Sequence, residues 1–338
     1  MRYTQFFTLW IVGTLGLAAC EFKPQTSPAP KPPVATPSDG PGRAEAVRPL
    51  KVVVSIPPLK GLVEPLLPPG STIDVLIPPG ASEHGYELPP QKLAAASVAD
   101  LVVTVGLGLE PQIDKFLKDR PRAGRKEVRF ADVPGLSLPK ADEHAGHDHA
   151  GHDHQHDHDH AIDPHLWLDP MAAKLLIGKL GEVLGAGSAA AKQEQRIEHV
   201  DAAYRSTLGA AKRRTIVVAH DAYGHLARRY GLEVIALSGL NAGEPKPADL
   251  KKAADVMRDK GLTTVFIEPQ LGRASADRLA AALNAKVAVL DPLGDGDWFA
   301  LMDKNLAALG AALDAPLPPT TSSPAKSSTP VDKPGTKP

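Results

Sequence analysis

Short apolar runs of strand length alternate with helical patterns in the first part of the chain after about residue 50. The runs are rich in Val, Ile and Leu and several end at Pro or Gly, which is typical of strands bounded by turns. The predicted strands are residues 50–58, 71–80, 101–106 and 126–135, and the predicted helices are 89–100 and 110–120. Strands that alternate with helices predict an α/β lobe with a parallel sheet.

The same alternation returns near the C-terminal end, after a long stretch rich in Ala, Leu, Lys and Gln. That stretch predicts a helical connector, which its glycines can divide into two helices. The later strands are predicted at 214–220, 232–239, 263–269 and 285–292, and the later helices at 221–231, 246–261, 274–284 and 297–313. The pattern therefore predicts two α/β lobes, residues 50–168 and 215–315, joined by a helical segment at 169–214.

The N-terminal 20 residues have the pattern of an export signal. An apolar run from Phe6 to Ala19 follows Arg2, and it is too short to span a membrane comfortably. The run ends in small residues before Cys20, which resembles the lipobox of bacterial lipoproteins. We expect residues 1–19 to be removed and Cys20 to carry a lipid; a buried helix with a chance cysteine is the alternative.

Composition sets two further segments apart from the lobes and limits the function classes. Residues 20–49 and 316–338 are rich in Pro and Ser, which predicts a tether and a disordered tail. The formal net charge is −1, so nothing indicates a nucleic-acid partner. No H-E-x-x-H, P-loop or G-x-S-x-G motif occurs, and the glycines of 105–110 lack the third glycine of a dinucleotide loop.

Nine of the 13 histidines fall within residues 144–170, in two different settings. His165 lies in the apolar, Pro-flanked segment DPHLWLDP, whereas the others lie in a His/Asp/Gly run: His144, His147, His149, His152, His154, His156, His158 and His160. Imidazoles are mostly neutral at pH 7 and can bind metal there. Because a flexible loop must be ordered on binding, we expect these eight to form weak auxiliary sites. A solubilising insert is the alternative.

Several candidate ligands follow predicted strands. His220 ends one strand and Asp291 another, while Glu83 and His84 lie in the loop after residues 71–80. His165 precedes the helical connector. Because ligands of open α/β sheets bind at the carboxyl ends of the strands, these side chains can converge between the lobes. Three imidazoles and one carboxylate complete a tetrahedral zinc shell.

Each candidate also has a simpler explanation. His84 can be an ordinary loop histidine, His220 a hydrogen-bonded strand-end histidine, and Asp291 the N-cap of the last helix. Glu268 also ends a strand and is a candidate for the lining of the site or for packing. His225 falls away from the strand end, and we assign it no role from the sequence.

Five motifs, in order along about residues 50–313, resemble the zinc-binding solute receptors of bacterial zinc-uptake ABC transporters. They are PPGASEHGYELPPQKLAAASVADLVVTVG, DPHLWLDP, VVAHDAYGHLARRYGL, FIEPQ and VLDPLG. The resemblance implies two Rossmann-like lobes with parallel sheets, joined by a long rigid helix, with a metal site in the inter-lobe cleft. It also implies a His/Asp-rich loop, which falls here on residues 142–160.

Residue by residue, the resemblance implies metal ligands His84, His165, His220 and Asp291, with Glu83 as a possible additional ligand. It implies a monomeric receptor, not an enzyme, that captures zinc outside the cytoplasm and delivers it to a permease with its ATPase. The lipid on Cys20 would hold the receptor at a membrane, in the periplasm or at the cell surface. This chain departs from some relatives because its single cysteine allows no disulfide within a lobe.

Alternatives remain open at this point. Manganese receptors of the family resemble this chain but have a carboxylate where His220 stands, and three imidazoles suit zinc better than a harder ion. Copper and nickel also bind imidazole. A zinc hydrolase would need an open coordination position. A metal-sensing or adhesion lipoprotein is a third class.

Overall fold

The computed structural model describes residues 48–138 and 162–315. The predicted signal peptide, Cys20, almost all of the tether, the eight loop histidines and the tail lie outside these ranges. No helix within the described ranges is both long enough and apolar enough to cross a membrane.

The N-terminal half forms a four-stranded parallel sheet of order β2-β1-β3-β4. Its strands are β1 (Lys51–Val54), β2 (Thr72–Val75), β3 (Leu101–Thr104) and β4 (Lys126–Arg129). The register places Val54 beside Val75 on one side and Val103 on the other. Central parallel strands are covered on both faces, which explains the unbroken apolar run of β3.

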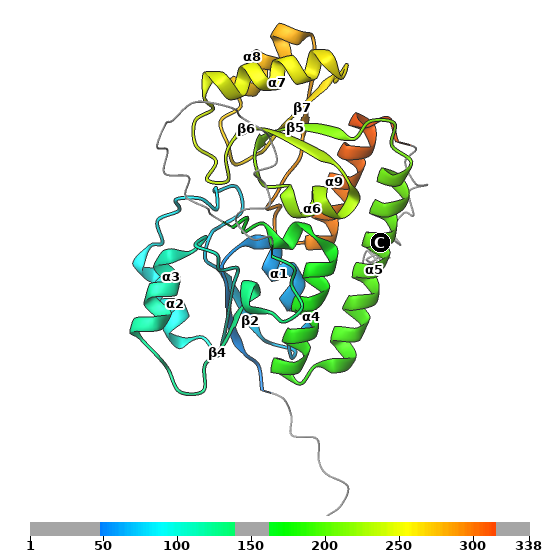
Figure 1. The fold of residues 1–338 in the computed structure, drawn as a ribbon. Coiled ribbons are helices and arrows are strands. Elements are labelled where there is room, and N and C mark those ends of the chain that lie inside the picture. The colour runs from blue at the N-terminus through cyan, green and yellow to red at the C-terminus, as the bar shows by residue number, and fades with distance from the viewer. Residues whose placement is uncertain (1–47, 139–161, 316–338) are drawn as a thin grey trace, which may run out of the picture. The chain divides into compact units, whose positions relative to one another are not determined.

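Helices α2 (Pro90–Val98) and α3 (Pro111–Asp119) lie together on one face of this sheet (Figure 1). The sequence predicts one strand over residues 50–58, but strand β1 ends at Val54. Helix α1 (Pro57–Val63), which the sequence does not predict, follows it. Proline is well tolerated in the first helical turn, where its missing N–H has no partner to lose. The prolines of this stretch therefore begin a helix. After β4 the backbone forms the short 3-10 helix η2 (Phe130–Asp132). The observed strand is therefore shorter than the predicted strand at 126–135.

Two helices form the connector. Asp169 is the N-cap of helix α4 (Pro170–Leu184), and its carboxylate accepts the Met171 N–H at 2.8 Å. Gly185, with φ 68°, is the C-cap. Helix α5 (Gly187–Gly209) then packs along α4, and Figure 1 shows the two side by side. The left-handed conformation at Gly185 is the ordinary way to end a helix, so this glycine divides the connector.

The C-terminal half repeats the α/β pattern. Its strands are β5 (Thr215–His220), β6 (Glu233–Ser238), β7 (Thr264–Ile267) and β8 (Lys286–Val289). Its helices are α6 (Gly224–Tyr230), α7 (Pro247–Asp259), α8 (Ala274–Leu283) and α9 (Trp298–Ala312). Parallel ladders join β5 to β6 and β7 to β8, and β5 also contacts β7. The predicted α/β class with parallel sheets is confirmed.

Two buried tryptophans connect the segment that carries His165 to the turn after β8 and to the start of α9. The Trp167 indole donates to the Pro292 carbonyl at 2.6 Å, and the Trp298 indole donates to the Trp167 carbonyl at 2.8 Å. Both rings are fully buried. A buried indole N–H needs a partner, so these bonds fix the short 3-10 helix η3 (Leu166–Leu168) that follows His165.

Candidate metal centre

Four side chains from three separate segments meet at one point. Glu83 and His84 follow β2, His165 precedes η3, and His220 is the last residue of β5. One ligand atom from each lies within 4.8 Å of the corresponding atom of every other. Three of these four side chains follow or end strands in the two halves of the chain, as expected for ligand sites of parallel sheets.

The spacing of the imidazoles fits a zinc ion. The Nε2 atom of His165 lies 3.3 Å from Nε2 of His84 and 3.3 Å from Nε2 of His220. Zinc–nitrogen bonds of about 2.0–2.1 Å at tetrahedral angles place two ligand nitrogens ~3.3 Å apart. The two measured distances therefore match the spacing of ligand nitrogens in a tetrahedral zinc shell.

A buried carboxylate completes the group. Glu83 Oε1 lies 3.6 Å from Nε2 of His165 and 4.0 Å from Nε2 of His84. It has no hydrogen-bond partner among the described residues, although its side chain is only 1% exposed. An unpaired buried oxygen is costly, and a cation at this point would pair it.

Two further carboxylates hold the histidines by their other ring nitrogens. Nδ1 of His165 donates to Asp163 Oδ1 at 2.7 Å, and Nδ1 of His220 lies 2.6 Å from Glu268 Oε2. A carboxylate on Nδ1 places the proton there and leaves the Nε2 lone pair for a metal. No carboxylate contact of this kind involves Nδ1 of His84 within the described ranges.

The candidate ligands differ in proton affinity. Burial lowers the pKa of His84 to about 4. Burial alone would also lower the pKa of His165, but two carboxylates outweigh burial and raise it to about 9: Asp163, which accepts its Nδ1–H, and Glu83, whose Oε1 lies 3.6 Å from its Nε2. Burial would raise the pKa of Glu83, but the nearby histidines, His165 above all, outweigh burial and hold it below its ordinary value. At neutral pH the metal-free site therefore has a neutral His84 and a protonated His165, whose proton a metal must displace.

Asp291 lies outside the group of four. Its Oδ1 accepts the N–H groups of Leu293 and Gly294, both at 3.0 Å, and the side-chain amide of Gln270 at 2.9 Å. These bonds shape the turn after β8, and Asp297, rather than Asp291, caps the last helix. The assignment of Asp291 as a ligand stays a prediction, and Glu83 is the carboxylate that the structure brings to the histidines.

Two residues of the site's support were missed from the sequence. The sequence motif DPHLWLDP gives no role to Asp163, yet its carboxylate orients His165. His225 was given no role, but its Nε2 donates to the Asp163 carbonyl at 2.9 Å. A carboxylate two residues before a candidate ligand was a usable signal for Asp163. Nothing local marks His225, because its partner is 62 residues away.

A cavity of about 490 Å³ opens beside Glu83 and His84. Apolar side chains of Tyr86, Leu107 and Leu240 line it, together with several carboxylates. None of the described residues that line it is a lysine or an arginine. Because carboxylates without cationic partners favour a positive guest, this cavity suits the approach of a metal ion to the site.

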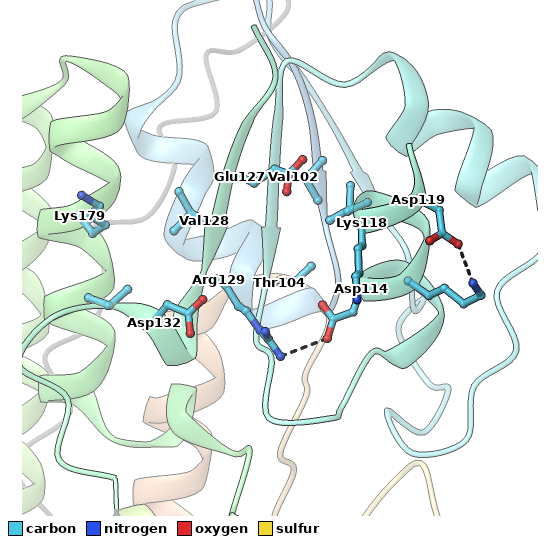
Figure 2. A pocket seen from close by; sticks show the side chains of 13 residues that line it. Val102, Thr104, Asp114, Lys118, Asp119, Glu127, Val128, Arg129, Asp132 and Lys179 are labelled. Atoms are coloured by element: carbon cyan, nitrogen blue, oxygen red, sulfur yellow. Dashed lines mark hydrogen bonds and ion pairs between the residues drawn. The ribbon is translucent and has the colours of Figure 1, made fainter. Parts of the chain in front are cut away.

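The larger cavity shown in Figure 2, about 770 Å³, contains none of the candidate ligands. It lies between α3, β4 and Lys179 of α4. Half of its charged side chains pair with each other: Arg129 with Asp114 at 3.2 Å and Lys115 with Asp119 at 2.6 Å. This surface therefore gives no indication of a second site.

Comparison with known proteins places most of the chain in one family. The model of the family described as zinc-uptake complex component A, periplasmic, matches residues 52–312. Among curated proteins, the zinc-binding lipoprotein AdcA of Streptococcus pneumoniae is 27% identical over 287 residues, which cover 78% of this chain and 56% of AdcA. This chain therefore spans about half the length of that lipoprotein.

Two more matches cover most of both chains. The high-affinity zinc uptake system protein ZnuA of Bacillus subtilis is 27% identical over 260 residues, 72% of this chain and 78% of that protein. The solved structure of a ZnuA deletion mutant with zinc bound has a TM-score of 0.65 and 26% identity, and the match covers 79% of this chain and 98% of that one.

Proposed function

Because the chain belongs to the family of periplasmic zinc-uptake complex components, we propose that it captures zinc outside the cytoplasm and delivers it to an ABC transporter permease. The ion is cargo, and the proposed ligands are His84, His165, His220 and Glu83. The observation that carries the proposal is the 3.3 Å spacing of His165 Nε2 from the two other Nε2 atoms, beside a buried, unpaired carboxylate oxygen. Zinc-bound and zinc-uptake relatives support the same cargo.

Ligand chemistry favours zinc over manganese. Three imidazoles suit a borderline ion, whereas manganese prefers oxygen ligands. His220→Glu exchanges one of these nitrogens for oxygen, so we expect it to weaken zinc relative to manganese in competition titrations. An unchanged preference would show that geometry, rather than ligand type, sets the choice.

A hydrolytic role is the weaker candidate. Catalytic zinc needs an open position for water or substrate. Glu83 occupies the position that such a water would need, because its Oε1 already lies among the imidazole nitrogens. The proposal is therefore a receptor and not an enzyme.

The first experiment asks which carboxylate completes the shell. Protein purified without an affinity tag, stripped and reloaded with zinc, should bind one tight equivalent by calorimetry. We expect Glu83→Gln to weaken this site and Asp291→Asn to leave it nearly unchanged, since Asn keeps an acceptor for the Leu293 and Gly294 N–H groups. The reverse result would restore Asp291 as the ligand.

The segments outside the described ranges complete the proposal. We propose that a lipid on Cys20 and the tether at 20–49 hold a monomeric receptor near the permease, and that residues 142–160 supply weak auxiliary metal sites. Deletion of 142–160 should leave one tight site and remove only weaker equivalents, because His165 lies outside the deletion. Loss of the tight site on deletion would show that the loop supplies a ligand.

A further inference from the structure

Asp163 links a metal ligand to a helix of the C-terminal half. Its Oδ1 accepts two bonds from His165, the backbone N–H at 2.9 Å and Nδ1–H at 2.7 Å. Its carbonyl accepts the Nε2–H of His225 at 2.9 Å, and its other carboxylate oxygen, Oδ2, lies 3.7 Å from the same Nε2. The carboxylate therefore fixes the ring of His165, while His225 fixes the backbone that carries the carboxylate.

The contact between Asp163 and helix α6 is so close that a side chain at position 224 would have to displace the Asp163 carboxylate. A Cβ built on Gly224 would lie 2.6 Å from Asp163 Oδ2. The backbone of Gly224 has no positive φ that would itself require glycine. Glycine is favoured here because a side chain would collide with the Asp163 carboxylate. The glycine lets the first turn of α6 reach the carboxylate that holds His165.

The same turn is joined to another ligand. His220 ends β5, its carbonyl accepts the Ala222 N–H at 2.9 Å, and α6 begins at Gly224. Asp163 and His225 are 8% and 4% exposed, so water competes little for their hydrogen bond. The segment 220–225 thus supplies one imidazole ligand directly and fixes the segment that carries a second.

We propose that Gly224 and His225 form a clamp on Asp163 that sets the position of the His165 imidazole relative to His220, and thereby the affinity of the metal site. His225 is a positioning residue, because it acts through Asp163 and does not contact the ion. The inference rests on the proposed zinc function. Its consequence is that two residues without a ligand atom at the site control how well three imidazoles converge on one ion.

The test uses two unrelated changes and two controls. His225→Phe keeps a buried ring but removes the donor, and Gly224→Ala inserts a methyl group against Asp163 Oδ2. His225→Gln is the conservative rescue, since its amide N–H can donate to the same carbonyl. Gly187→Ala is the matched control for Gly224→Ala, because Gly187 is also the first residue of a helix and its Cβ would meet nothing within 4 Å.

Zinc affinity and the visible spectrum of the cobalt-loaded full chain are the measurements. Supporting the ligand by its other ring nitrogen is typically worth about 10–100-fold in metal affinity. We expect losses of about this size in His225→Phe and Gly224→Ala, with an altered cobalt spectrum, and near wild-type behaviour in His225→Gln and Gly187→Ala. A change of packing alone would alter the melting temperature but not the cobalt spectrum.

Wild-type affinity and spectrum in both His225→Phe and Gly224→Ala would overturn the clamp. If His225→Phe fails to fold, Gly224→Ala alone decides. If the wild-type chain binds neither zinc nor cobalt, the proposed function fails and the clamp is judged separately in metal-free protein. In that case the imidazole ¹⁵N shifts of His165 must change in Gly224→Ala, and unchanged shifts reject the clamp.

Discussion

The two sides of the metal centre are built differently. His165 and His220 have fully buried side chains, and each has a carboxylate at Nδ1. His84 lies in the loop after β2, its side chain is 10% exposed, and it borders the acidic cavity. One side of the site is therefore fixed before an ion arrives, whereas the side that faces the cavity holds the candidate ligand that water can most easily replace.

Removal of a fixed ligand should have the largest effect. Zinc sites with four ligands bind with about 10–16 kcal/mol, so one ligand contributes ~3 kcal/mol, or ~100-fold in affinity. We expect His165→Ala to exceed this, because it also leaves the buried Asp163 carboxylate without its hydrogen-bond partner. His84→Ala should cost less, since water can enter at its exposed edge. Equal losses in calorimetric titrations of the two variants would remove the distinction between the two sides.

The pH dependence of zinc binding should report the fixed side alone. His165 has a pKa raised to about 9 and is protonated at neutral pH, whereas His84, with a pKa lowered to about 4, is already neutral. Zinc must displace the His165 proton, so affinity should rise about tenfold per pH unit between pH 6 and 8 and level off above pH 9.

Calorimetry in buffers of different ionisation enthalpy measures this proton directly. About one proton should be released per zinc ion at pH 7. The same pKa shift sets the pH dependence of stability in the metal-free chain. The raised pKa of His165 stabilises the fold fully below the unfolded pKa of about 6.5, and this stabilisation is lost as pH rises through 9. Release of no proton at pH 7 would contradict the assigned charge on His165.

The carboxylate behind His220 should matter less than the ligand itself. Glu268→Ala removes the partner of Nδ1 and lets the ring turn, so zinc affinity should fall about 10–100-fold. Glu268→Gln keeps an acceptor for the Nδ1 proton and should retain most of the affinity. If both variants bind as wild type, the packing of β5, rather than Glu268, holds the ring.

The smallest effect is expected away from the site. Asp201 accepts Arg229 Nε at 2.6 Å, Arg205 Nε at 2.9 Å and the Tyr230 hydroxyl at 2.8 Å. Burial alone would raise the pKa of Asp201, but these bonds outweigh it and lower the pKa to about 2. The stabilisation is therefore present above the unfolded pKa near 3.9 and is lost as pH falls through 2.

Asp201→Asn should lower the melting temperature by about 2–4 °C at pH 7 and leave zinc binding unchanged. The difference between variant and wild type should shrink as pH falls from 4 towards 2. Asp255→Asn is the control, because Asp255 forms only exposed pairs with Lys251 and Arg258 and should not change the melting temperature. An altered zinc affinity in Asp201→Asn would show that the connector helix acts on the site.

The α/β class and the positions of the eight described strands could be predicted from the sequence alone, and the sequence also indicated the three histidines that the structure brings together. Strands that alternate with helices form parallel sheets, and the carboxyl ends of those strands are where ligand-binding side chains gather. His220 ends β5 and His84 follows β2, so their convergence follows from that rule. Helix α1 could not be predicted from the sequence, because apolar residues and prolines continue from the strand into the helix without a polar residue that marks the boundary.

The sequence did not indicate which carboxylate lies beside the histidines or which residues hold them in place; these depend on how the chain packs. Asp291 lies two residues after the end of β8 and its Oδ1 accepts bonds within its own turn, while Glu83 Oε1 lies near the imidazoles. The donor to Asp163, His225, lies 62 residues further along the chain. Strand ends locate a residue to within several ångströms, whereas ligation depends on side-chain direction and on the packing of distant segments, which periodicity in the sequence does not record.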